Sequence, residues 1–330
     1  MSTRRSYVSF WWVLAGCLLA GTTIAATPPS SGGDALANDG NYPAARAAFT
    51  AAQKAAPNDA SLMAKIADVD AQLGNDKSAV AWARRAVAAA PHTAKYQMLL
   101  GDALSNYVND VSVFRKLSIA HAVHAAYQQA VQLAPHDADA RTRLAMFYSI
   151  APGIAGGSAA QADAQIAALA VDDPVKADLV RANRAYRNQQ YAAAEALYRK
   201  AAASATDSAG DLALGNFLAQ RKRAADALAV YRKTIAAFPH APVAYYEIGK
   251  LASEGKAPAA EGARDLATYL SQPIDWQKGD PTYDWAHYRL GLIAARGGDT
   301  AKAKAEYQAA LRLDPAFKQA RQALAKLRAT

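Results

Sequence analysis

Small and apolar residues recur every three or four positions along most of the chain, as Ala303, Tyr307 and Ala310 do near its end. This spacing places such residues on one face of an α-helix. No segment alternates apolar and polar residues with the two-residue period of a β-strand. The chain is also rich in Ala, Leu, Arg, Lys and Gln, which are good helix formers. The pattern therefore predicts an all-α fold.

Prolines that follow the helical segments recur with a period close to 34 residues. Pro57 and Pro91 are 34 residues apart, and so are Pro239 and Pro273. Other intervals are longer by a few residues, and one spans close to two periods. A regular period of this length is typical of proteins built from stacked helix pairs. The full set is Pro57, Pro91, Pro135, Pro174, Pro239, Pro273 and Pro315.

Each period repeats the same kinds of residue in the same order. A small residue stands in the first helix, Gly-Asn or Gly-Asp makes the turn, and Ala and an aromatic residue follow in the second helix. Gly accepts a positive φ at the turn, and Asn or Asp caps the next helix. The last unit shows the pattern as Leu290, Gly291, Gly298, Asp299, Ala303, Tyr307, Ala310 and Pro315. Over about residues 34–315 the chain resembles the tetratricopeptide repeat (TPR) family.

This resemblance implies an all-α, TPR-like α-solenoid of about eight helix pairs over residues 34–330. A last helix, Ala316–Leu327, is rich in Lys, Arg and Gln, as a capping helix with a solvated face should be. We expect residues 26–33 to be a linker, because Ser30–Gly33 reads as a loop. Only Asp34–Asp39 then remain for the first helix.

Three insertions interrupt the period, near residues 108–117, 150–157 and 274–283. Insertions in repeat arrays fall in loops and often on a functional face. The second, glycine-rich insertion is similar to an Ala-Pro-Gly-Ile-x-Gly-Gly-Ser string of exported bacterial TPR proteins. It lacks the Gly-Lys-Ser/Thr of a phosphate-binding loop. Ser158 and Gln161 instead predict a capping box that starts the next helix.

Residues 1–25 have the features of a secretory signal peptide. Arg4 and Arg5 precede an apolar stretch, and Thr23-Ile24-Ala25 is an acceptable cleavage site. Two alternatives stay open: lipidation of Cys17 in a lipoprotein-like box, or an uncleaved membrane anchor. All three predict repeats outside the cytoplasm, either periplasmic or secreted or held at the membrane as a lipoprotein. Membrane contact is expected only with a lipidated Cys17 or an uncleaved signal.

Charge and motifs narrow the functional classes. The net charge of +9 is spread along the chain, whereas nucleic-acid binding needs a clustered basic face. Cys17 is the single cysteine, so zinc sites built on cysteine and a cysteine nucleophile are excluded once the signal is removed. His121 and His124 share a helix face, but no carboxylate or cysteine completes a metal site. We expect no enzyme activity, no cofactor, no metal and no nucleic-acid partner.

The resemblance implies that the first helix of each unit lines a concave groove that binds a protein or peptide. Asn183 and Asn216 occupy equivalent positions in successive units, where an Asn amide can both donate to and accept from a peptide backbone. The basic residues that grip a carboxylate in chaperone-binding TPRs are not reproduced, since Ala213 and Glu247 stand there. The predicted partner-binding residues are Arg143, Asn183, Tyr186, Arg187, Asn216, Tyr246, Lys250 and Arg289.

We therefore expect a protein-binding TPR scaffold of the bacterial cell envelope that uses this groove. One alternative is a lipoprotein accessory subunit of an envelope complex, which would bind through its outer face and its insertions. A second alternative is a binder of glycans or small ligands that uses the region of Trp276 and Trp285.

Overall fold

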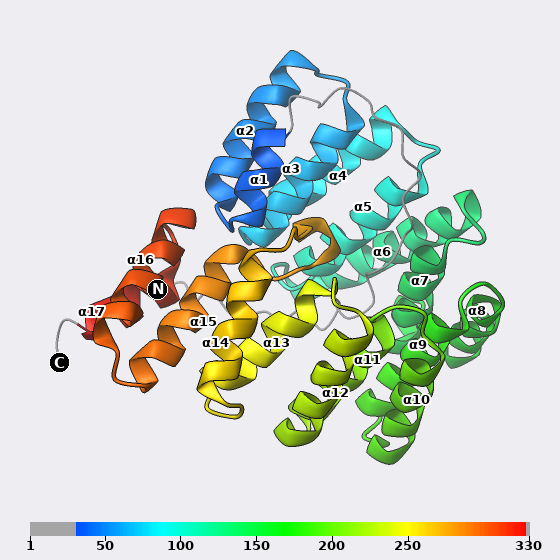
Figure 1. Cartoon of the computed structure of the whole chain (residues 1–330). Coiled ribbons are helices and arrows are strands. Elements are labelled where there is room, and N and C mark those ends of the chain that lie inside the picture. The colour runs from blue at the N-terminus through cyan, green and yellow to red at the C-terminus, as the bar shows by residue number, and fades with distance from the viewer. Residues whose placement is uncertain (1–30, 328–330) are drawn as a thin grey trace.

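The computed structural model describes residues 31–327, which form seventeen α-helices and two short 3-10 helices, with no β-strand in that range. The helices α1–α16 make eight antiparallel pairs, and α17 follows the last pair (Figure 1). The expected solenoid of eight pairs with a terminal helix is thus confirmed. The signal peptide over residues 1–25 and Cys17 lie outside the described residues.

The helices have the following bounds: α1 Ser31–Asn38, α2 Tyr42–Ala55, α3 Ala60–Gln72, α4 Asp76–Ala89, α5 Ala94–Tyr107, α6 Val113–Leu133, α7 Ala138–Ile150, η2 Gly153–Ala155, α8 Ala159–Asp172, α9 Pro174–Arg187, α10 Tyr191–Ser204, α11 Ala209–Gln220, α12 Ala224–Ala237, α13 Pro242–Ser253, α14 Ala259–Leu270, η3 Trp276–Lys278, α15 Tyr283–Arg296, α16 Thr300–Leu313 and α17 Lys318–Leu327.

The first helix starts earlier than the sequence suggested. Helix α1 begins at Ser31, so the expected linker over residues 26–33 and the expected loop at Ser30–Gly33 are wrong in their last three residues. The reason is packing. A side chain at Gly33 would collide with the buried ring of Phe49, so glycine lets this turn of α1 lie directly on α2.

The same contact recurs inside later units. The rings of Tyr127, Tyr231 and Tyr307 are each at most 2% exposed. Each ring fills the space where the Cβ of a non-glycine residue would lie on the first helix of its own unit. A glycine on one helix and a tyrosine on the other therefore set the close spacing of the pair. The pairs are Gly101 with Tyr127, Gly215 with Tyr231, and Gly291 with Tyr307.

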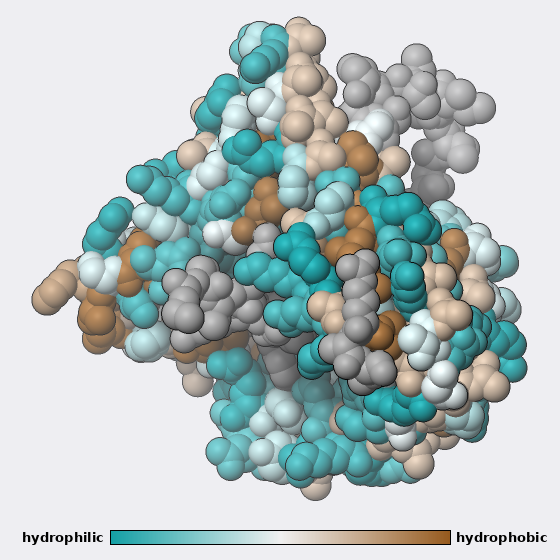
Figure 2. Space-filling view, turned by 90° about the vertical axis from the view of Figure 1, so that its left-hand side faces the viewer, coloured by the Kyte–Doolittle hydropathy of each residue, from teal (hydrophilic) through white to brown (hydrophobic). Residues whose placement is uncertain are grey.

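The eight units follow a curved path that brings the loop before α15 next to α1 and α3 (Figure 1). Seen from the side of α16 and α17, the visible surface is largely hydrophilic, and apolar residues form smaller, separate groups (Figure 2). None of the helices within residues 31–327 combines the length and the apolar character needed to span a bilayer.

The turns inside the units give a testable prediction. Gly74 has a φ of +72° at one turn, whereas Lys222 has a φ of +62° at an equivalent turn. A left-handed conformation costs a residue with a side chain roughly 1–2 kcal/mol, and the greater freedom of unfolded glycine offsets part of this. We expect Lys222→Gly to raise the free energy of unfolding by about 1 kcal/mol, measured by thermal denaturation.

Gly74→Ala is the matched control. A Cβ at Gly74 would meet no atom within 4 Å, so only backbone strain acts, and the melting temperature should fall. A lower melting temperature for Lys222→Gly would contradict the argument.

Candidate functional site

The inner face of the solenoid is built from the first helices of the units. Neighbouring first helices contact one another, as α3 and α5, α5 and α7, α7 and α9, and α13 and α15 do. In Figure 1, α7, α9, α11 and α13 lie nearer the centre than α8, α10 and α12. All eight predicted partner-binding residues lie on these first helices. They form three groups along the chain rather than one site.

The group nearest the C-terminus contains Tyr246, Lys250 and Arg289, which α13 and α15 bring together. Arg289 Nε donates to Tyr246 Oη at 2.8 Å, and Arg289 Nη1 donates to Ser253 Oγ at 3.0 Å. Lys250 Nζ lies 2.8 Å from Glu247 Oε2, and Tyr246 is only 4% exposed. These groups form hydrogen bonds and an ion pair with one another. They therefore stiffen the inner face, and few of their donors and charges remain available to a partner.

A second group surrounds Arg143 at the other half of the inner face. Arg143 Nε donates to both carboxylate oxygens of Asp102, at 2.9 and 3.1 Å, and Tyr127 Oη donates to the same carboxylate at 2.7 Å. Burial raises the pKa of nearby Asp68 to about 6, and a hydrogen bond from Gln277 opposes this shift. The charge of Arg143 is thus matched within the protein.

The central group contains the remaining four residues on α9 and α11. Asn216 Oδ1 accepts a hydrogen bond of 2.7 Å from Tyr231 Oη, so its amide helps to hold α12. Tyr186 packs edge-on against Tyr191 and Phe217, with ring centroids 5.6 and 5.9 Å apart. Asn183 in turn forms a side-chain hydrogen bond with Tyr198, so both amides predicted to hold a peptide are engaged with tyrosines inside the protein.

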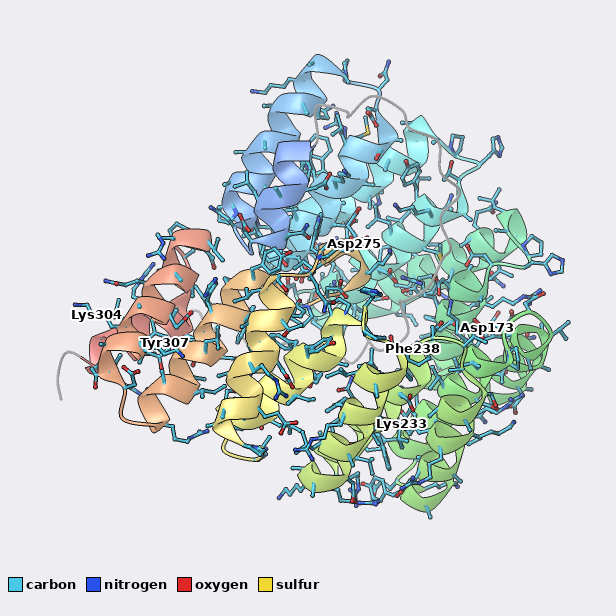
Figure 3. All side chains as sticks on the ribbon, viewed as in Figure 1. Asp173, Lys233, Phe238, Asp275, Lys304 and Tyr307 are labelled. Carbon is cyan, nitrogen blue, oxygen red and sulfur yellow. The ribbon has the colours of Figure 1, made fainter. Side chains whose placement is uncertain are left out.

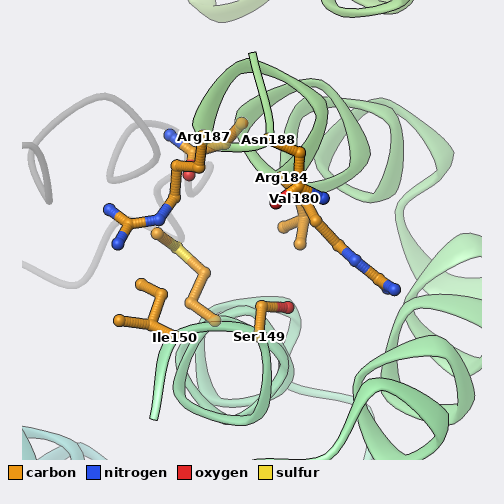
Figure 4. Close-up of a pocket in the computed structure, with 8 residues that line it drawn as sticks. Ser149, Ile150, Val180, Arg184, Arg187 and Asn188 are labelled. Atoms are coloured by element: carbon orange, nitrogen blue, oxygen red, sulfur yellow. The ribbon is translucent and has the colours of Figure 1, made fainter. Parts of the chain in front are cut away.

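Asn183 and Arg187 line a small pocket between α7 and α9 (Figure 4). Its apolar lining comes from Met146, Ile150 and Val180. Arg187 and its neighbour Asn188 are exposed, and Arg187 has no ion pair within residues 31–327. Of the eight predicted residues, Arg187 is the one whose charge is most available to a partner. Three of the eight lining residues are apolar and five are polar.

The second insertion and the histidines have structural roles in this region. Ser158 caps α8 by accepting from the Gln161 backbone N–H at 3.3 Å, which confirms the N-cap. The other half of the predicted capping box is wrong, because the Ser158 N–H donates to the Tyr148 carbonyl at 2.9 Å. His124 stacks on Phe147, with ring centroids 5.1 Å apart, and its Nε2 lies 2.9 Å from Tyr148 Oη. His121 is exposed. Within the described residues no cluster of three potential metal ligands surrounds this pair.

The third insertion closes the solenoid by binding to its first two units. Trp276 of η3 is 4% exposed and joins a core cluster with Phe49 and Ile66. Its backbone N–H donates to Asn38 Oδ1 at 3.0 Å. The Gln277 side chain donates to Asp68 Oδ2 at 2.8 Å. We call residues 274–283 the clasp. Figure 3 shows its Asp275 where the N-terminal helices meet the C-terminal half.

The clasp changes how the inner face must be interpreted. It covers Asp68 on α3, one of the first helices that form this face. It also buries Trp276, so this ring cannot stack on a sugar as the glycan-binding alternative requires. The sequence predicted the insertion but not the helices that it contacts, because Trp276 and Asn38 are 238 residues apart and no local pattern links them.

Comparisons with known proteins agree with this architecture. Two family models described as tetratricopeptide repeat match the chain, one over residues 32–94 and 179–242 and the other over residues 285–317. The chain therefore contains TPR repeats, in its first two, fifth, sixth and last units. No curated protein matches the sequence.

Several solved structures are similar to this chain. Yeast Tom70 matches with a TM-score of 0.59 and 14% identity, over 97% of this chain and 67% of that one. Cut9-Hcn1, the APC/C hetero-tetramer, matches with a TM-score of 0.45 and 13% identity, over 90% of this chain but only 54% of that one. Pseudomonas aeruginosa PilF has a TM-score of 0.42 and 15% identity, over 71% and 97%. The likeness to Tom70 shows an α-solenoid fold and nothing finer.

The clasp gives a prediction about shape. Trp276→Ala should remove the contact with Phe49 and cost roughly 3–5 kcal/mol. We expect the solenoid to open, with a larger radius of gyration in small-angle X-ray scattering. The control is Trp285→Ala, because Trp285 packs against Tyr288 and Phe317 within the last part of the chain. Equal radii for the two variants would mean that the clasp does not hold the solenoid closed.

Asp284 beside the clasp gives a prediction about pH. Burial raises the pKa of Asp284 to about 7 from 3.8; the Thr282 hydroxyl opposes this shift and the Asp314 carboxylate adds to it. The folded chain therefore holds this proton more tightly than the unfolded chain. Binding of this proton stabilises the folded chain fully below about pH 4, and this stabilisation is lost as the pH rises to about 7. Tyr42 and Gly40 face the same carboxylate.

Asp284→Asn should flatten this part of the pH dependence. Urea midpoints for both chains at about pH 5 and about pH 8 would test it. Asp68 and Asp76, whose carboxyl pKa values are also raised to about 6, are present in both chains and cancel in the comparison. If the urea midpoint changed between the two pH values by the same amount in both chains, the assignment to Asp284 would be wrong.

Proposed function

We propose that this chain, an all-α solenoid containing TPR repeats, is a non-catalytic scaffold that binds an extended segment of a partner protein beside the pocket between α7 and α9. The observation that carries the proposal is the contrast between Arg187 and the other predicted charged residues. Arg143, Lys250 and Arg289 have their charges or donors matched within the protein. Arg187 stands exposed next to an apolar lining.

The pocket indicates the chemistry of the partner. Met146, Ile150 and Val180 would receive one apolar side chain, and flexible Met adapts to different shapes. The Arg187 guanidinium would donate to a carboxylate or to backbone carbonyls of the segment. The Asn188 amide can donate and accept beside it. Since the clasp covers part of the inner face of the first two units, the central units are the accessible part of the groove.

We also propose export to the bacterial cell envelope. The support is the charged start at Arg4 and Arg5, the apolar stretch after it and the cleavage site at Ala25. A lipidated Cys17 would hold the scaffold at the membrane as an accessory subunit of an envelope complex. Mass spectrometry of the mature N-terminus distinguishes the two forms, because cleavage before Cys17 and cleavage after Ala25 leave different masses.

Site-specific photo-crosslinking tests the binding site. A photo-reactive amino acid in place of Asn188 should form an adduct with an envelope protein, and Arg187→Ala should weaken the adduct at least tenfold, as loss of a central arginine does at other interfaces. The matched control is Arg312→Ala on α16, because Arg312 is also exposed and has no ion pair within the described residues. An adduct that survives Arg187→Ala as well as Arg312→Ala would refute this pocket as the site.

A further inference from the structure

The first two insertions place nearly all of the exposed large apolar side chains on one edge of the solenoid. Six such side chains are found within residues 31–327, and five of them belong to α6 and to the end of α7 with η2. A contiguous exposed apolar group in a folded protein marks a surface that meets something else. The five are Val113, Phe114, Leu117, Ile150 and Ile154. We call them the apolar edge.

Helix α6 carries three of these residues on an extension that the repeat does not need. It has 21 residues, whereas the second helices of most other units have 14. The seven additional residues amount to two turns, or about 10 Å of helix. Val113 is 77% exposed and Phe114 is 96% exposed on these turns. The extension therefore projects apolar side chains away from the core of its own unit.

The α7–α8 loop brings the other residues to the same edge. The first insertion joins α5 to α6 in the third unit, and the second joins α7 to α8 in the fourth unit. Helix α6 contacts η2 directly. Val113 and Leu117 lie eleven and seven positions before His124, hence on nearly the same face of α6. His124 contacts Phe147 and lies beside Gly156 of the loop. The apolar face of the extension thus continues toward η2.

The loop holds Ile154 outward in a fixed conformation. Its backbone is closed by hydrogen bonds from the N–H groups of Ala155 and Gly157 to the Pro152 carbonyl, at 2.8 and 3.0 Å. Ala155 is buried, whereas the next residue toward the N-terminus, Ile154, is 79% exposed. Ile154 therefore gains nothing from the core and adds to the exposed apolar side chains of α6 and α7.

Positive charges lie among these apolar side chains. Arg115 and Lys116 are exposed between Phe114 and Leu117, and neither has an ion pair within the described part of the chain. Asp110, the acid closest to them in sequence, adjoins Asp76. A projecting tip of apolar and basic residues matches a bilayer, whose acyl chains take the apolar groups and whose anionic headgroups attract the basic ones.

We infer that the apolar edge docks on the surface of a membrane that contains anionic lipid. This contact is separate from the protein-binding pocket and needs neither a lipidated Cys17 nor an uncleaved signal. It would orient the solenoid with its α5–α6 and α7–α8 turns toward the bilayer. Projecting apolar side chains of this kind can insert into a lipid surface, whereas a protein partner would have to supply a groove for each of them.

A polarity-sensitive fluorophore on position 114 tests the inference. The full chain with Cys17→Ser and Phe114→Cys is labelled and mixed with vesicles of phosphatidylcholine alone or with added phosphatidylglycerol. The expected result is a blue shift of the emission with the anionic vesicles only. Arg115→Glu together with Lys116→Glu should lower the apparent affinity about tenfold or more, since each basic residue contributes on the order of 1 kcal/mol near such a surface.

Val171 provides the matched control position. It is 84% exposed, yet it lies near the opposite end of α8, roughly 18 Å along the helix from Ala159. The fluorophore on Val171→Cys should show no shift. No shift at position 114, equal shifts at both positions, or an equal shift with neutral vesicles would each overturn the inference. Because the signal is local, vesicle binding through the N-terminal segment alone cannot imitate the expected result.

Discussion

The close approach of two helices within each unit is the constraint on which the rest of the structure depends. In several units a glycine of the first helix leaves space that a side chain of the second helix fills, a tyrosine ring for Gly215 and Tyr231 and a leucine for Gly249 and Leu266. Helix pairs too small to fold alone gain their stability by stacking on one another. Contacts between neighbouring first helices make that side of the stack the inner face, so the stack curves. The curvature brings the C-terminal half back to the first units, where Trp276 can reach Phe49.

Closure of the solenoid explains why the inner face is mostly engaged with itself. Partly buried charges on this face would be costly without partners. Arg143 is accordingly matched by Asp102, and Arg289 donates to Tyr246 and Ser253. Gln277 of the clasp donates to Asp68 in the same way. Arg143 and Arg289 were expected to hold a peptide in an open groove. In this structure they hold helices of the solenoid together, so a partner would be recognised by exposed groups such as Arg187.

The sequence predicted what depends on local contacts. The helix pairs, their turns and the capping role of Ser158 follow from residues a few positions apart, and the structure has them. It could not predict the burial of Tyr246 or the target of Trp276, because both depend on contacts between units and across the solenoid. The eight predicted binding residues lie on first helices, as their repeat positions imply, while their availability to a partner was not predictable from repeat position alone.

The three insertions differ in whether their largest apolar side chains are buried or exposed. All three fall outside the segments that match the TPR models, so none is required by the repeat itself. The third is used by the structure, since Trp276 joins the core that Phe49 and Ile66 form in the first two units. The first two leave Phe114 and Ile154 in solvent although the loop is rigid and the helix is regular. Large apolar side chains that project from a departure from the repeat are best explained by an external surface, and the basic residues among them favour a lipid one.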